Sequence, residues 1–187
     1  AFAMLSGSGG APRAAIFMGK KDNETAEKIM ANCFSLILIF AVGLTILFSI
    51  FAPKLLILFG ASDATLPYAV EYARIYIFGS IFVLIVLGMN LFITTQGFSK
   101  ISMMTTLIGA VINVILDPIF IFAFDMGVRG AAIATVLSQA VGAIWVLRFL
   151  TGEKTILKLK LSNMKLDPKV FAPCLPVFNW AFVMGTA

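Results

Sequence analysis

The chain has 187 residues, of which 60% are hydrophobic and 12% charged, and its formal net charge is +5. Soluble domains carry about twice this charged fraction, so the composition excludes a soluble globular domain. The absence of histidine excludes a histidine-ligated zinc or haem site and a Ser-His-Asp triad. Basic residues flank apolar runs and line no face with aromatic residues, so nucleic-acid binding has no support. We expect an integral helical membrane protein that is not an enzyme and needs no cofactor.

Apolar runs of the length that crosses a bilayer, about 20 residues, recur along the chain. A small, glycine-rich segment at 1–18 resembles the end of a span, and residues 20–28 form a charged surface segment. The first complete span is predicted at 31–52, where Pro53 ends it, and Asn23 is the expected N-cap of this helix.

The second span is predicted from about 75 to 95, after a short helix that begins at Pro67. The turn 96–100 then leads into two apolar segments, 101–124 and 130–150. Because only residues 125–129 separate these segments, we expect them to form an antiparallel helical hairpin. The fold class is therefore all-α, a polytopic bundle with about four complete spans and two partial ones.

Residues 151–169 form a basic connector in which leucine and lysine alternate from Leu157 to Leu161. Both a short strand and a segment lying on acidic lipid headgroups fit this alternation. A last apolar run begins at Val170, and we expect the sequence to be a fragment of a longer protein.

Lysine and arginine are unevenly shared between alternate loops. One side holds eleven of them, and the other holds Lys54, Arg74 and Arg129. Since basic residues favour the cytoplasmic side, loops 13–30, 96–100 and 148–169 are predicted to be cytoplasmic. The connection 125–129 would then face outward. Gln96 would lie at the cytoplasmic end, where hydration makes a polar side chain inexpensive and uninformative.

Four polar side chains interrupt the predicted hairpin. Asn113 and Asp117 are four residues apart, as are Thr135 and Gln139, so each pair shares one helix face. Met126 is nine residues from both Asp117 and Thr135. The hairpin should therefore place Asp117 opposite Thr135, and Asn113 opposite Gln139 one turn deeper.

Asp117 is the most informative of these residues, since an ionised carboxylate inside a membrane costs at least about 2.5–3.5 kcal/mol. Asp117 could be a neutral structural hydrogen bonder to a neighbouring helix. The functional interpretation is that it binds a monovalent cation or takes up a proton. The amide oxygen of Asn113 and the hydroxyl of Thr135 are hard ligands of the kind that sodium accepts.

Proline and tyrosine residues near this cluster suggest further roles. Pro118 removes a backbone donor and is expected to bend the helix near Val114, which makes it a hinge candidate. Tyr72 and Tyr76 fit the aromatic belt of a membrane interface. Tyr76 could alternatively look into a cavity at a depth similar to that of Asp117.

The run from Asn113 to Phe122 (NVILDPIFIF), followed by Met126–Thr135 (MGVRGAAIAT), closely resembles the multidrug and toxic compound extrusion (MATE) transporters. The turn Thr95–Phe98 and the loop Gly19–Asp22 fit the same family in order. The resemblance covers roughly residues 7–150. It implies twelve transmembrane helices in two six-helix lobes, with alternating access driven by sodium or proton influx.

The resemblance also implies a domain organisation. Residues 1–150 would be a partial N-terminal lobe, holding the end of helix 2 and helices 3–6. Residues 151–169 would link the lobes in the cytoplasm, and 170–187 would begin helix 7. The first helix, which carries an acidic residue needed by several members, and the second lobe have no counterpart in this sequence, so transport is expected only of the complete protein.

The resemblance assigns roles to the same polar residues. Asn113 and Asp117 match the cation-site pair of the fifth helix, and Thr135 matches its sixth-helix partner. Gln139, Tyr76 and Tyr72 are weaker cavity-lining candidates, because either tyrosine could be the fourth-helix residue that takes part in some members. Apart from a possible sodium ion at Asp117, no metal is expected.

The implied function is secondary antiport, in which amphipathic and often cationic drugs leave the cell in exchange for sodium or protons. The implied location is the inner, cytoplasmic membrane, with the lipid bilayer, such drugs and the remainder of the transporter as partners. One alternative is a flippase for lipid-linked sugars, although the only lysine or arginine inside the predicted spans is Arg148, at the cytoplasmic end of the last one. A non-transporting membrane fragment is another alternative.

Overall fold

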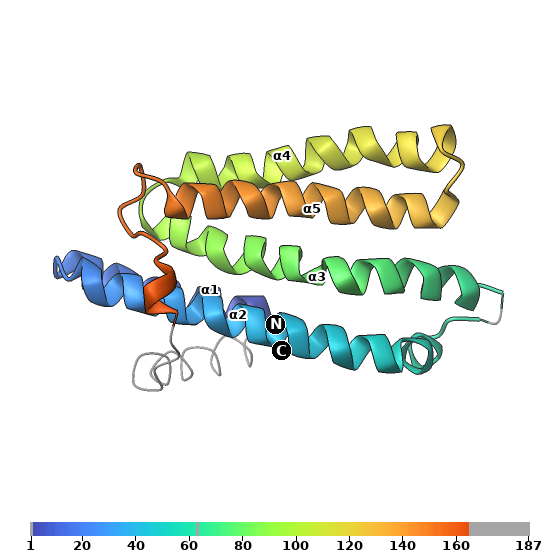
Figure 1. Cartoon of the computed structure of the whole chain (residues 1–187), viewed down its shortest axis with the longest axis horizontal. Helices are drawn as coiled ribbons and strands as arrows, with labels where there is room; N and C mark the ends of the chain where they lie inside the picture. Colours follow the sequence, from blue (N-terminus) through green and yellow to red (C-terminus); the bar gives the residue numbers. More distant parts are fainter. Residues whose placement is uncertain (1, 63, 165–187) are drawn as a thin grey trace.

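The computed structural model describes residues 2–62 and 64–164 (Figure 1). This part of the chain forms helices only, which confirms the predicted all-α class. The elements are α1 (Phe2–Gly19), α2 (Asn23–Leu58), α3 (Leu66–Thr95), α4 (Ser99–Pro118), the π-helical turn η1 (Ile119–Ala123), α5 (Gly127–Thr151) and the 3-10 turn η2 (Leu161–Asn163). The predicted apolar run that begins at Val170 lies outside the described residues.

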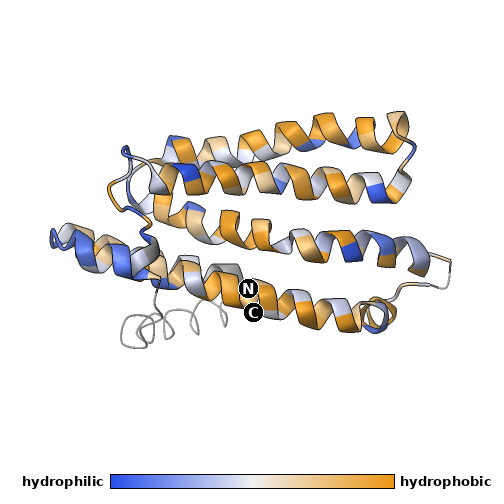
Figure 2. Cartoon of the chain, viewed as in Figure 1, coloured by the Kyte–Doolittle hydropathy of each residue, from blue (hydrophilic) through white to orange (hydrophobic). Residues whose placement is uncertain are grey.

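Four helical segments are long and apolar enough to cross a membrane, in agreement with the predicted number of complete spans. They are 23–58, 66–95, 99–123 and 127–151. Hydrophobic residues cover most of their length in Figure 2. Many of these residues are exposed, as expected of helices whose surroundings are lipid or further protein.

Helix α3 lies at the centre of the bundle and packs against α1, α2, α4 and α5. Its buried side chains Met89, Phe92 and Ile93 form the middle of the hydrophobic core. Small residues allow the helices to approach closely. A Cβ atom on Gly10 of α1 would overlap the sulfur of Cys33 in α2, so a larger residue there would force the Cys33 side chain to move.

Helix α2 extends beyond its predicted end at Pro53, and it begins within one residue of the predicted start. It continues through Pro53, because the polar groups of a broken helix would meet lipid without hydrogen-bond partners. Its N-cap is Asp22, where Asn23 was expected, and the Asp22 carboxylate accepts the Thr25 N–H at 3.1 Å. Hydrogen bonds from the Thr25 side chain and backbone hold the pKa of Asp22 below its ordinary value, so the cap is lost only as the pH falls into the acidic range.

The predicted short helix at Pro67 and the span that follows it are one continuous helix, α3, whose first turn contains the proline. Proline is compatible with this position, because the first-turn N–H groups of a helix have no intrahelical acceptor.

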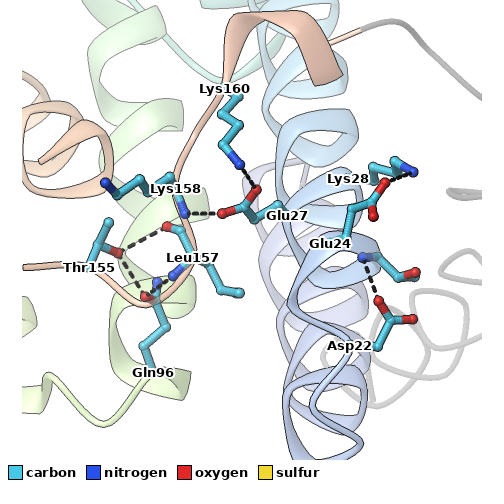
Figure 3. Close-up of polar contacts among 10 residues, drawn as sticks. Asp22, Glu24, Glu27, Lys28, Gln96, Thr155, Leu157, Lys158 and Lys160 are labelled. Atoms are coloured by element: carbon cyan, nitrogen blue, oxygen red, sulfur yellow. Dashed lines mark hydrogen bonds and ion pairs between the residues drawn. The ribbon is translucent and has the colours of Figure 1, made fainter. Parts of the chain in front are cut away.

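The connector does not form the strand that was one interpretation of its alternation, and its position on lipid headgroups stays a prediction. Gln96, at the end of α3, is 6% exposed. Its side-chain oxygen accepts hydrogen bonds from the Thr155 hydroxyl at 2.8 Å and from the backbone N–H groups of Ile156 and Leu157 at 2.9 Å each (Figure 3). The expectation that Gln96 is simply hydrated is therefore wrong.

Glu27 of α2 holds the next residues of the connector. Its carboxylate accepts the Lys158 N–H at 3.0 Å and pairs with the Lys160 ammonium at 2.6 Å (Figure 3). Leu157 and Leu159 are buried between these polar contacts, which explains the leucine–lysine alternation as one apolar face and one solvated face. We call Glu27, Gln96 and residues 155–160 the connector clamp.

The clamp also bears on the predicted orientation. It joins the start of α2, the α3–α4 turn and the connector at one end of the bundle, while the other two helix connections lie at the opposite end (Figure 1). The described parts of the three loops predicted to be cytoplasmic thus lie together, and their assignment to the cytoplasm stays a prediction.

Replacing Glu27 with Gln should loosen the connector, since the change removes the charge that pairs with Lys160 and leaves the Lys158 N–H only a neutral amide oxygen as acceptor. Because Lys160 is half exposed, the loss should be about 1 kcal/mol or less. We expect faster tryptic cleavage after Lys158 and Lys160. The matched control is Glu24→Gln, one turn away, which removes the exposed pair with Lys28 and should leave cleavage unchanged. Equal cleavage in both variants would contradict the assignment.

Candidate functional site

Three polar side chains meet between α4 and α5, inside two of the membrane-spanning helices. The Asn113 side-chain nitrogen lies 3.4 Å from an Asp117 carboxylate oxygen and 3.5 Å from the Thr135 hydroxyl oxygen. All three residues are half-buried. Strong hydrogen bonds of this type are about 2.7–3.2 Å long. The Asn113 amide nitrogen therefore lies between a carboxylate oxygen and a hydroxyl oxygen without binding either tightly.

The hairpin register differs from the predicted one by about a turn. Asn113, not Asp117, lies opposite Thr135, and Gly109 lies beside Ser138 one turn further from the connection. Two features of the connection explain the shift. Helix α5 begins at Gly127, not Gly130, and the i to i+5 bonding of η1 places an extra residue in the turn that precedes the connection.

The irregular backbone lies after Pro118, whereas the sequence suggested a bend near Val114. Helical structure continues through Pro118, and the π-turn follows, with the Phe124 N–H donating to the Ile119 carbonyl at 3.0 Å. The widened turn brings the main chain of Phe120 against Gly130, where a Cβ atom would lie 2.7 Å from it. This contact fixes the end of α4 against α5, next to Asp117.

A cavity of about 250 Å³ extends from the cluster toward the clamp end, between α3, α4 and α5. Asn113, Thr135 and Gln139 are among its lining residues, whereas Asp117 is not, and the ion-binding roles of these residues stay predictions. The lining also includes three residues that the sequence analysis did not single out, namely Thr105, Thr106 and Ser138. Their spacing of three to eight residues from Asn113 or Thr135 could have indicated that they share a helix face with the polar cluster. No lysine or arginine is among the residues that line this cavity.

Tyr72 and Tyr76 lie apart from this cavity lining and stack on one another, with ring centroids 5.8 Å apart. Their participation in a site stays a prediction. At the same end of the bundle, Arg129 of α5 pairs with Glu71 of α3 at 2.7 Å. Both side chains are well exposed, so this pair aligns the helices but adds little stability.

Together, these features define a multi-pass membrane protein with a polar site between two of its spans. The family model MatE matches residues 1–119. The chain therefore belongs to the MatE family, as the sequence motifs predicted.

Curated relatives and solved structures agree with this assignment. The multidrug export protein MepA of Staphylococcus saprophyticus is 29% identical over 186 residues, covering 97% of this chain and 41% of that protein. An inward-facing multidrug resistance MATE family transporter of the MOP superfamily is 28% identical with a TM-score of 0.88, covering 94% of this chain and 40% of that one. An outward-facing MATE structure gives a TM-score of 0.85 at 27% identity, over 93% and 39% of the two chains. The chain thus spans about two fifths of the length of these relatives.

Proposed function

We propose that the full-length protein containing this chain is a secondary active antiporter of a bacterial cytoplasmic membrane. It exports amphipathic, often cationic drugs in exchange for sodium or protons. The observation that carries the proposal is the Asn113–Asp117–Thr135 cluster, because a carboxylate between membrane-spanning helices needs a cation or a proton to lower its cost. Family membership supports it, as does similarity to proteins named multidrug export proteins.

The cluster suggests how the ion and the drug exchange. Empty Asp117 is negative and attracts either an organic cation or the coupling ion. Loading with sodium or a proton neutralises the carboxylate and weakens its hold on the drug. Such competition drives transport only if inward and outward states bind the ion with different affinities. Residues 119–123 and Pro118 are the proposed point at which these states differ.

The direct test uses the full-length protein in proteoliposomes loaded with a fluorescent cationic drug. An imposed gradient of the coupling ion should drive the drug in the direction opposite to the ion flow. Whichever of the two gradients, sodium or proton, moves the drug identifies the coupling ion. Drug movement that is independent of both gradients would rule out antiport. The flippase alternative gains no support from the cavity, whose lining lacks the cationic residues that would attract pyrophosphate.

Thr135→Val separates the two coupling ions, since it removes one oxygen ligand while keeping the shape of the side chain. If sodium is coupled, the half-maximal sodium concentration for drug export should rise roughly fivefold, as expected for the loss of about 1 kcal/mol. Thr135→Ser keeps the oxygen and is the matched control. A wild-type sodium dependence in the valine variant would remove Thr135 from the site.

A further inference from the structure

A second cavity, of about 330 Å³, lies at the clamp end of the bundle, remote from the polar cluster. It opens between the first turn of α4 and the last two turns of α5, which lie next to each other in Figure 1. Its lining consists of Ile101, Trp145, Arg148, Phe149 and Lys154. This cavity has no part in the transport cycle proposed above.

The inner part of the cavity is apolar and firmly packed. Phe149 meets Phe98 edge to face, with ring centroids 5.1 Å apart, so this wall is fixed by the α3–α4 turn. Trp145 is 40% exposed. Tryptophan concentrates at the level of lipid headgroups, because its ring is apolar and its N–H is polar. The cavity is thus suited to a ligand with an apolar portion.

The rim of the cavity is cationic. Arg148 and Lys154 are exposed, and no carboxylate is in the lining. The salt bridges found in the described residues use other cations, namely Lys28, Arg129 and Lys160. Glu153 precedes Lys154 and is exposed. Even when the Glu153 carboxylate is counted, the two cations leave a net positive charge at the rim. The rim is therefore suited to an anion.

We propose that this cavity binds one anionic phospholipid. Its phosphate is held by the Arg148 guanidinium and the Lys154 ammonium, and the adjoining glycerol and acyl chain lie along Ile101, Trp145 and Phe149. Basic pockets between transmembrane helices on the cytoplasmic side attract acidic headgroups in this way. A lipid is favoured over free phosphate because the wall between the cations and the bilayer is apolar.

The test measures binding of phosphatidylglycerol and phosphatidylcholine to the delipidated full-length protein by native mass spectrometry. We expect the protein to bind one phosphatidylglycerol molecule tightly and to bind phosphatidylcholine with lower affinity. The double variant Arg148→Gln with Lys154→Gln should weaken phosphatidylglycerol binding about thirtyfold, from the contribution of two cations at a membrane surface. Unchanged binding would overturn the proposal, as would equal affinity of the wild type for the two lipids.

Two controls separate a specific site from general surface charge and from misfolding. Lys20→Gln with Lys21→Gln removes the same charge at the α1–α2 turn, outside the cavity, and should keep the bound lipid. Arg148→Lys with Lys154→Arg keeps both charges and should also retain it. If the Lys20 and Lys21 variant loses the lipid equally, or if inorganic phosphate displaces it, the cavity is not a phospholipid site.

Discussion

Replacing Asp117 with Asn should abolish coupled drug export by the full-length protein. The substitution keeps the shape of the side chain and its hydrogen bond to Asn113, but it removes the charge that a cation or proton neutralises. Coupling between two ligands is typically worth about 1–3 kcal/mol, which corresponds to about 5–150-fold in affinity. We expect drug accumulation in cells with the variant to approach that of cells without the transporter.

The matched control for this experiment is Asp125→Asn, eight residues along the chain in the exposed connection between η1 and α5. Asp125 has a φ of 51°, a conformation that asparagine also adopts, so the same charge is removed without strain. This control should export the drug normally. Normal export by the Asp117 variant, at equal amounts of protein in the membrane, would show that Asp117 is a structural hydrogen bonder.

Gly130→Ala is expected to have the second largest effect, on stability. The new methyl group would lie 2.7 Å from the backbone carbon and oxygen of Phe120. A main chain cannot rotate away as a side chain can, so α5 and η1 must separate. Overpacking of this kind costs about 1–3 kcal/mol. The midpoint of thermal unfolding in detergent should fall, and export should weaken because the end of α4 moves with Asp117.

Gly43→Ala provides the comparison within the same chain. Gly43 is a helical glycine of α2, and outside its own stretch of helix backbone no atom lies within 4 Å of the position that a Cβ would take. Alanine there should be neutral or stabilising by up to about 1 kcal/mol, because it lowers the entropy lost on folding. If the two alanine variants unfold at the same temperature, the close Gly130–Phe120 contact does not contribute to the stability of the α4–α5 hairpin.

The existence of the four spans could be predicted from the sequence because a helix needs about 20 apolar residues to cross a bilayer. The residues at which the helices end were harder to predict. Proline ends helices in water, yet Pro53 lies inside α2 because a membrane leaves the backbone no other hydrogen-bond partner. Similarly, Asp22 and Asn23 are both good N-cap residues, and only the direction of the Asp22 side chain distinguishes them.

The polar site was predicted as a set of residues but not as a set of contacts. Spacing by four placed Asn113 and Asp117 on one face, as the structure has them. The partner across the hairpin depended on where the connection turns, and no periodicity in the sequence reports the π-turn at 119–123. Gln96 was underestimated for a related reason. Its burial comes from a connector about 60 residues away, a contact that local hydropathy does not show.

The connector clamp determines where tension on the connector would reach the helical bundle. Tension on the chain beyond Met164 is borne by Ser35, whose hydroxyl donates to the Met164 carbonyl at 2.8 Å, and then by Glu27 and Gln96. The same segment is tied to α5, because the Leu159 N–H donates to the Leu150 carbonyl at 2.9 Å. A pull on the connector would therefore be divided among α2, the end of α5 and the α3–α4 turn, in shear across several hydrogen bonds, and no single helix would carry it alone.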